Sequence, residues 1–169
     1  MFQSFCGQTN LSLLSVLRRM PDALAEVCGS EEYSCISGVV RFYQTTSGMI
    51  VFAEISGLPE SENTPQIYGF HIHEGSICKG NMADPFSDAM THYNPGKREH
   101  PYHAGDLPPL FGNHGFALSL VLTDRFCLTD VFGRTVIIHD RPDDFTTQPS
   151  GNSGTKIACG VIRSCSRCV

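Results

Sequence analysis

Two histidines near the middle of the chain have the spacing of metal ligands on a β-strand. His71 and His73 alternate with Ile72, so both imidazoles should lie on the same face of an extended segment. One histidine facing a core is more often a packing residue than a ligand. Two on one face favour metal binding, because burying two neutral imidazoles without a ligand is costly.

A second group of metal-ligand residue types follows within one irregular segment. It consists of His92, His100, His103 and Asp106, with spacings of eight, three and three residues. A loop with these spacings can wrap around one ion, and three imidazoles with one carboxylate match a tetrahedral zinc site. Any one of these histidines alone would be expected in solvent, but the set indicates a metal site.

A seventh candidate ligand, His139, ends an apolar strand-like run, and Asp143 and Asp144 follow it. A carboxylate near a metal-bound histidine often holds the ring by its other nitrogen, although a solvated turn explains this segment equally well. Two four-coordinate ions need eight ligand positions, and six histidines with one aspartate supply eight only if one imidazole bridges. A bridging imidazole indicates a redox metal held beside a structural one.

The composition limits which kinds of protein could carry these groups. The chain has 169 residues, of which 41% are hydrophobic and 17% are charged, and this balance suits one folded domain. No apolar run approaches the roughly 20 residues that a membrane span needs. The net charge is −5 and no long Lys/Arg block is present, which disfavours nucleic acid. We therefore expect neither a nucleic-acid nor a membrane partner.

Strand signals dominate the chain after a short N-terminal segment. Residues 1–22 could form a short helix, with leucines 11, 13, 14 and 17 on one face and Pro21 interrupting it. Runs rich in β-branched and aromatic residues predict strands at 36–43, 49–55, 67–73, 116–122, 135–139 and 157–162, with a hairpin turn at 45–48. Segments 74–115 and 140–156 contain seven of the ten prolines and should be long loops. The pattern predicts an all-β barrel or sandwich with two large loops.

Five motifs in this order closely resemble the copper/zinc superoxide dismutases, particularly their bacterial branch. They are GFHIHEG at 69–75, HYNP at 92–95, HPYHAGDL at 100–107, GRTVIIH at 133–139 and GNSGTKIACGVI at 151–162. The resemblance implies an eight-stranded Greek-key β-barrel, an immunoglobulin-like sandwich with long metal-binding and electrostatic loops. We expect this domain at residues 23–163, preceded by an N-terminal extension at 1–22 and followed by a C-terminal tail at 164–169.

The resemblance also implies a role for each candidate ligand. Copper would be bound by His71, His73, His92 and His139, and zinc by His92, His100, His103 and Asp106, with His92 as the bridge. Asp143 matches the family's aspartate that links a copper-binding histidine to a zinc-binding histidine, here His71 and His100. Cys78 and Cys159 match the family's intrasubunit disulfide.

The implied reaction is the disproportionation of superoxide to oxygen and hydrogen peroxide, with His92 carrying a proton. The family places an arginine three residues before the disulfide cysteine, where this chain has Lys156. The lysine ammonium is a mobile point charge, whereas the arginine guanidinium is a rigid group with forked donors. Attraction of the anion should therefore survive, while the anion is oriented less tightly. We expect Lys156→Arg to raise activity. The alternative is a copper-binding or copper-delivery protein on the same fold with little turnover.

The remaining cysteines and the termini carry weaker signals. Residues 11–17 are short for the apolar region of a signal peptide, and their basic neighbours follow them, so we expect a cytoplasmic protein. Cys165 and Cys168 form a CxxC motif at the end of the chain. We interpret it as a partly exposed pair of cysteines in the tail and not as a zinc site. We expect thiols without a catalytic role at Cys6, Cys28, Cys35 and Cys127, a surface position for His114, and a homodimer as one possible assembly.

Overall fold

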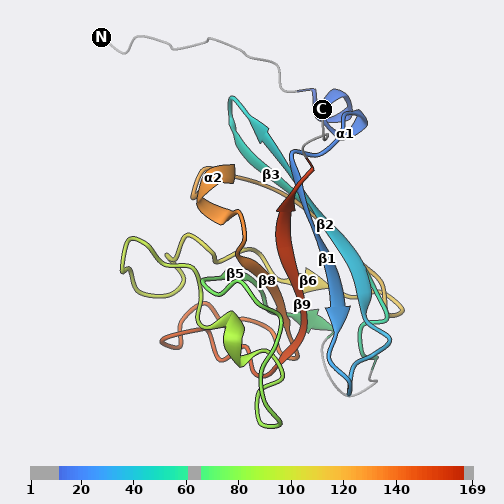
Figure 1. Ribbon diagram of the computed structural model, residues 1–169, viewed down its shortest axis with the longest axis vertical. Helices are drawn as coiled ribbons and strands as arrows, with labels where there is room; N and C mark the ends of the chain where they lie inside the picture. Colours follow the sequence, from blue (N-terminus) through green and yellow to red (C-terminus); the bar gives the residue numbers. More distant parts are fainter. Residues whose placement is uncertain (1–11, 61–65, 166–169) are drawn as a thin grey trace.

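The computed structural model describes residues 12–60 and 66–165, and β-strands form most of its regular structure (Figure 1). Seven antiparallel strands form one curled sheet in the order β5-β8-β9-β1-β2-β3-β7, while β4 pairs with β6. The strands are β1 (Ala23–Gly29), β2 (Ser37–Thr45), β3 (Gly48–Ser56), β4 (Ile67–Tyr68), β5 (Phe70–His73), β6 (Leu110–Phe111), β7 (Ala117–Thr123), β8 (Thr135–His139) and β9 (Lys156–Ser164). The prediction of an all-β fold is confirmed.

The predicted hairpin is present between β2 and β3. These strands pair in register from Ser37 opposite Ser56 to Thr45 opposite Gly48. Gly48 has a φ of 126°, and a Cβ at this position would lie 2.5 Å from the carbonyl oxygen of Thr123. Glycine is required here because its backbone adopts a positive φ and closely approaches the last residue of β7.

Strand β1 and the number of strands differ from expectation. The sequence patterns do not predict β1, because alanine and glutamate are poor strand formers and weaken its strand signal, although buried and outward residues alternate regularly along it. The described residues contain nine strand segments, whereas the resemblance implies eight. The segments β4 and β5 are separated only by Gly69.

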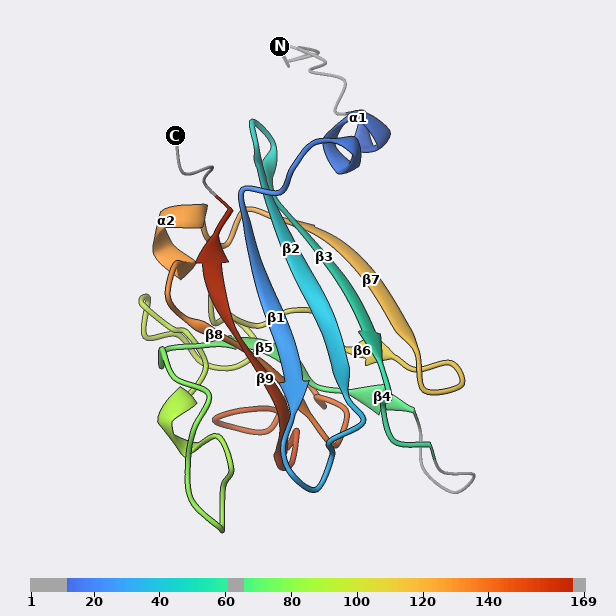
Figure 2. The same ribbon diagram turned by 45° about the vertical axis from the view of Figure 1, so that its right-hand side comes forward.

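The core lies on the inner face of the curled sheet, where more buried residues alternate with outward-facing ones along strands such as β1 and β7, while β5 and β8 are buried throughout. Val40 and Phe42 of β2 and Val51 and Ala53 of β3 belong to this cluster and are almost completely buried. Large parts of the two segments predicted as loops lie at the end of the sheet that carries β5 and β8, while the end of the first segment forms β6 beside β7 (Figure 2). These parts therefore lie beside the strands that contain His71, His73 and His139.

Helical structure is limited to short segments. The helix expected near the N-terminus is α1 (Leu13–Arg18), and none of its residues is buried, so its leucines pack against no core; Leu11 lies outside the described residues. The other helical segments are the 3₁₀ helix η1 (Ser87–Ala89) and α2 (Leu128–Val131). Across residues 12–60 and 66–165, no helix has the length and apolar character to span a membrane.

Candidate metal centre

The long loop after β5 folds back onto this strand through two backbone hydrogen bonds, and a third joins two parts of the loop to each other. Tyr93 N–H donates to Ile72 O at 2.8 Å, Ile72 N–H to Gly105 O at 2.9 Å, and Gly105 N–H to Tyr93 O at 2.8 Å. A Cβ at Gly105 would overlap the carbonyl oxygen of Ile72. Glycine therefore allows the loop to approach β5 as closely as a neighbouring strand would.

This approach brings residues from both parts of the loop opposite the two histidines of β5. Isolated β-bridges join His73 to His92 and His71 to Asp106. β8 pairs with β5 on its other edge and ends at His139, whose Nε2 lies 3.3 Å from Nε2 of His73. Histidines separated in sequence therefore meet at one end of the sheet.

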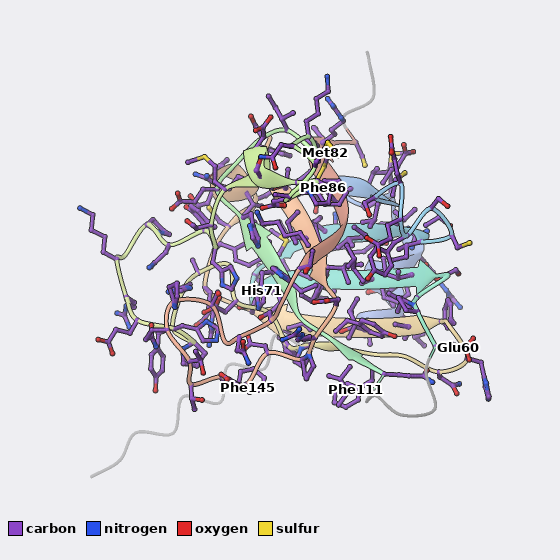
Figure 3. The ribbon with its side chains drawn as sticks, turned by 90° about the horizontal axis from the view of Figure 1, so that it is seen from below. Glu60, His71, Met82, Phe86, Phe111 and Phe145 are labelled. Atoms are coloured by element: carbon purple, nitrogen blue, oxygen red, sulfur yellow. A yellow bond between two sulfur atoms is a disulfide. The ribbon has the colours of Figure 1, made fainter. Side chains whose placement is uncertain are left out.

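Seven candidate ligands form two groups that share His92. The first ligand group is His71, His73, His92 and His139, and the second ligand group is His92, His100, His103 and Asp106. Within each group, one potential ligand atom of every residue lies within 4.8 Å of those of the others. All seven side chains are buried, and Figure 3 shows His71 inside the body of the molecule, far from the rim residues Met82 and Phe111.

Four buried ring nitrogens in these groups have no hydrogen-bond partner among the described residues. They are His71 Nδ1, His92 Nε2, His100 Nδ1 and His103 Nδ1. Nδ1 of His100 and of His103 lie 3.1 and 3.2 Å from Asp106 oxygens, but without hydrogen-bond geometry. A buried unpaired polar atom costs about 1–3 kcal/mol. Nitrogen and carboxylate atoms that converge in this way fit bound metal ions.

Asp143 lies between the two groups and holds one ring of each. Nε2 of His71 donates to Oδ2 of Asp143 at 2.9 Å, and Nε2 of His100 donates to Oδ1 at 2.8 Å. Each ring is thereby left with Nδ1 free to bind an ion. A carboxylate in this position fixes the tautomer and orientation of a metal-binding histidine.

Burial shifts the pKa values of three of the buried histidines. Burial, assisted by the neighbouring His92, lowers the pKa of His139 to about 4, and burial also lowers the pKa of His71 and of His73 well below the usual value. Burial alone would raise the pKa of Asp106, but His92 Nδ1 at 2.8 Å and the other imidazoles hold it below its usual value. Neutral rings and an ionised carboxylate are the states that bind metal ions.

Comparisons with known proteins agree with this geometry. The family model described as copper/zinc superoxide dismutase (SODC) matches residues 36–162. The chain belongs to the copper/zinc superoxide dismutase family. A superoxide dismutase [Cu-Zn] of Legionella pneumophila is 35% identical over 134 residues, covering 75% of this chain and 77% of the relative. The extracellular superoxide dismutase [Cu-Zn] of Drosophila melanogaster is 32% identical over 166 residues, covering 86% and 87%. The solved copper/zinc superoxide dismutase from Brucella abortus is 25% identical with a TM-score of 0.68, covering 82% of this chain and 98% of that one.

In this member of the copper/zinc superoxide dismutase family, a cleft of about 640 Å³ leads to the first ligand group. His73, His92 and His139 line it. Its charged lining residues are Glu74, Lys97, Arg98, Glu99 and Lys156. Three cations and two carboxylates therefore line this cleft, on a protein whose net charge is −5.

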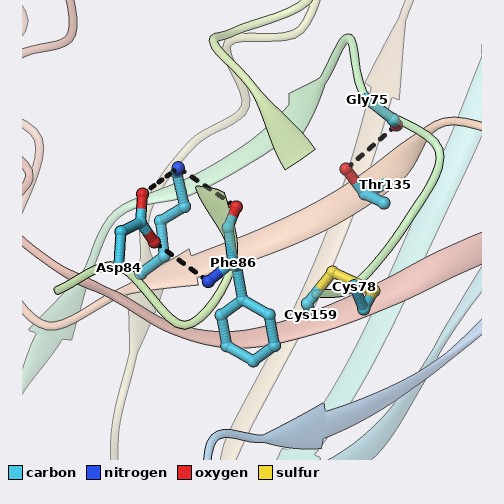
Figure 4. Close-up of a disulfide and its surroundings, with 7 residues drawn as sticks. Gly75, Cys78, Asp84, Phe86, Thr135 and Cys159 are labelled. Atoms are coloured by element: carbon cyan, nitrogen blue, oxygen red, sulfur yellow. Dashed lines mark hydrogen bonds and ion pairs between the residues drawn. A yellow bond between two sulfur atoms is a disulfide. The ribbon is translucent and has the colours of Figure 1, made fainter. Parts of the chain in front are cut away.

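Lys156 is not a free cation in this cleft. Its Nζ donates to Oδ2 of Asp84 at 2.6 Å and to the carbonyl oxygen of Phe86 at 3.2 Å (Figure 4), and its side chain is only 14% exposed. No motif in the sequence marks Asp84 as a functional residue. No spacing signal could have done so, because the two residues are 72 positions apart.

The predicted disulfide between Cys78 and Cys159 is present, with a sequence separation of 81 residues (Figure 4). It ties the first long loop to β9, and Cys159 packs with Phe86, Ala89 and Ile137 in a small second core. Cys28, Cys35 and Cys127 are exposed free thiols and Cys165 is partly buried, while Cys6 and Cys168 lie outside the described residues. His114 is on the surface, with its side chain 92% exposed.

Proposed function

We propose that this chain disproportionates superoxide to oxygen and hydrogen peroxide, with copper in the first ligand group and zinc in the second. The observation that carries this proposal is the pair of buried groups sharing His92, whose converging nitrogens lack hydrogen-bond partners. Copper, when bound, supplies one-electron chemistry with successive superoxide anions. Zinc has no accessible second oxidation state, so its role is structural.

We assign the proton-carrying step to Nε2 of His92. This atom has no hydrogen-bond partner, while Nδ1 of the same ring lies 2.8 Å from Oδ1 of Asp106. When Nε2 is not a ligand, it can take a proton and pass it to the reduced substrate in the cleft. Asp106 and the rest of the second ligand group keep the ring in position during this step.

Attraction of the substrate anion is assigned to the cations of the cleft. Lys156 draws superoxide toward the first ligand group, and Lys97 and Arg98 add to the positive field of the cleft. Because Asp84 neutralises much of the charge of Lys156, the other two cations contribute a larger share. Lys156→Arg should raise activity, and Lys156→Ala should lower it.

Metal analysis with electron paramagnetic resonance, combined with a superoxide assay, tests the proposed function. We expect close to one copper and one zinc per chain, and turnover that His71→Ala abolishes. His114→Ala is the matched control, since this exposed histidine lies outside both ligand groups and should leave turnover unchanged. Bound copper without turnover would instead support the copper-delivery alternative, and zinc without copper would contradict both.

A cytoplasmic location is a separate proposal. It is supported by free thiols at Cys28, Cys35, Cys127 and Cys165, because reducing compartments keep such thiols reduced. Cell fractionation with an antibody to the full chain should place the protein with a cytosolic marker. Recovery in an extracytoplasmic or secreted fraction would contradict the proposal.

A homodimer is also proposed, through the outer face of the edge strand β7. Leu118, Leu120 and Leu122 alternate along this strand and are 59%, 37% and 49% exposed. Burying such a stripe against its copy would remove apolar surface from water. Light scattering should give a dimeric mass that Leu120→Glu halves, whereas a monomeric wild type would refute this assembly.

A further inference from the structure

A free thiol lies beside the disulfide on the neighbouring strand. In the antiparallel pairing of β1 with β9, Cys28 is directly opposite Cys159. Cys28 is exposed and belongs to the outward-facing set of β1, together with Leu24 and Glu26. Residues directly opposite each other in an antiparallel pair point to the same face. The thiol of Cys28 is therefore on the side of the sheet that carries the Cys78–Cys159 bond.

The surface around these three cysteines is open. Cys28, Cys78 and Cys159 line one crevice of about 530 Å³, and Figure 4 shows β1 running beside β9 next to the disulfide. Opposite residues in antiparallel strands have Cα atoms about 4.5–5.5 Å apart, which is within the range of about 4.4–6.8 Å that a disulfide spans. A bond between Cys28 and Cys159 therefore needs no change in the register of the sheet.

We propose that Cys28 is a nucleophilic thiol–disulfide exchange site for the Cys78–Cys159 bond. Cys28 gives its proton to solvent, and its thiolate attacks Sγ of Cys159. The Cys28–Cys159 bond forms as the Cys159–Cys78 bond breaks, and the electron pair leaves on Sγ of Cys78, which then takes a proton. One thiol and one disulfide are present before and after, so the exchange needs no oxidant or reductant.

The exchange changes what the disulfide holds together. The Cys78–Cys159 bond joins the first long loop to β9, whereas a Cys28–Cys159 bond would join two strands that already pair in the sheet. After exchange, the loop around Cys78 would be held by noncovalent contacts alone, including the Lys156–Asp84 pair and the packing of Phe86. The same loop continues to His92, so its release would loosen the site.

Disulfide mapping of the metal-loaded full chain tests this directly. The protein is incubated at mildly alkaline pH, quenched with acid, alkylated and digested, and its cross-linked peptides are identified by mass spectrometry. We expect a Cys28–Cys159 peptide pair with Cys78 alkylated. Cys28→Ser should abolish this pair, and Cys35→Ser, which removes another exposed free thiol, should leave it unchanged. Cys78–Cys159 as the only linkage, with Cys78 never alkylated, would overturn the proposal.

A second variant tests the geometry independently of the exchange equilibrium. In Cys78→Ser, treatment with glutathione disulfide should join Cys28 to Cys159 in most molecules. With Cys28→Ser added, the reaction should stop at a mixed disulfide between glutathione and Cys159. Recovery of Cys28 and Cys159 as separate glutathione adducts in the single variant would overturn the proposal. The superoxide assay enters neither measurement, so failure here is distinguishable from failure of the proposed activity.

Discussion

Gly151 lies directly against the carboxylate of Asp143, and a Cβ at Gly151 would overlap Oδ1 of Asp143. Gly151 also has a φ of 66°, a backbone conformation that favours glycine. Asp143 connects His71 in the first ligand group to His100 in the second. The absence of a side chain at Gly151 is therefore a condition for holding both groups in place.

Gly151→Ala should weaken metal binding as well as stability, because the new methyl group must displace Asp143. Gly133→Ala is a matched control, since Gly133 has a similar φ of 74° but a Cβ there meets nothing within 4 Å. We expect both variants to lose about 1–3 kcal/mol from backbone strain. Only Gly151→Ala should also lose about tenfold or more in metal affinity. Thermal unfolding and chelator competition measure the two effects, and equal metal affinity in both variants would contradict the argument.

Asp143→Asn should weaken copper and zinc binding together. An asparagine has one acceptor oxygen and cannot accept hydrogen bonds from both His71 and His100 at the two positions that the carboxylate oxygens occupy. We expect the affinity for the metal ions to fall about 10–100-fold. Titration with a chelator measures this loss. Asp144→Asn is the matched control, because the exposed carboxylate of Asp144 accepts hydrogen bonds from Thr146 and Thr147 in its own loop. Metal affinity should not change in this variant. Loss of one metal without the other would show that Asp143 does not couple the groups.

Asp84→Asn should raise the rate at which superoxide is captured, because it frees the charge of Lys156. Asparagine keeps the acceptor for the Phe86 N–H, which donates to Oδ1 of Asp84 at 3.0 Å, so the turn should persist. We expect kcat/KM to rise about 2- to 5-fold at low ionic strength and to fall more steeply with added salt. Stopped-flow kinetics over a salt series measures both quantities.

Two further variants isolate the pairing from the overall change in charge. Asp88→Asn adds the same charge to the same loop at an exposed position that does not line the cleft, and it should leave kcat/KM nearly unchanged. In a Lys156→Met background, Asp84→Asn should have no effect on kcat/KM. A rise that persists in that background would show that Asp84 acts through some other group.

The metal-free protein should become less stable as the pH falls from about 6.5 to about 4. Burial lowers the pKa of His139 from 6.5 to about 4. Between these values the unfolded chain binds a proton that the folded chain does not, so the free energy of unfolding rises with pH across this window. A difference of about 2.5 pKa units corresponds to roughly 3 kcal/mol. Urea unfolding at several pH values measures this slope, and a flat profile would argue against neutral buried rings.

The candidate ligands were predictable because their chemistry is local. Alternation in β5 is enough to place His71 and His73 on one face, and the loop residues around His100 have ligand spacing in the sequence. The order of the motifs indicates the family for the same reason, since each motif is a short contiguous segment. Strand β1 was not predicted, because alanine and glutamate are poor strand formers and weaken the strand signal of this segment. Its pairing with β2 and β9 in the folded sheet overrides that weak local preference.

Contacts between distant segments were decided by the tertiary structure alone. The pairing of Asp84 with Lys156 depends on how the first loop packs over β9. Neither segment has a local sequence pattern that predicts a partner 72 residues away. Loop packing likewise places Asp143 against Gly151. Strand register places Cys28 opposite Cys159. The sequence by itself determined which side chains can bind metal and which strands can form. Only the fold decided which charges are neutralised and which thiol faces the disulfide, because these properties depend on distances through space.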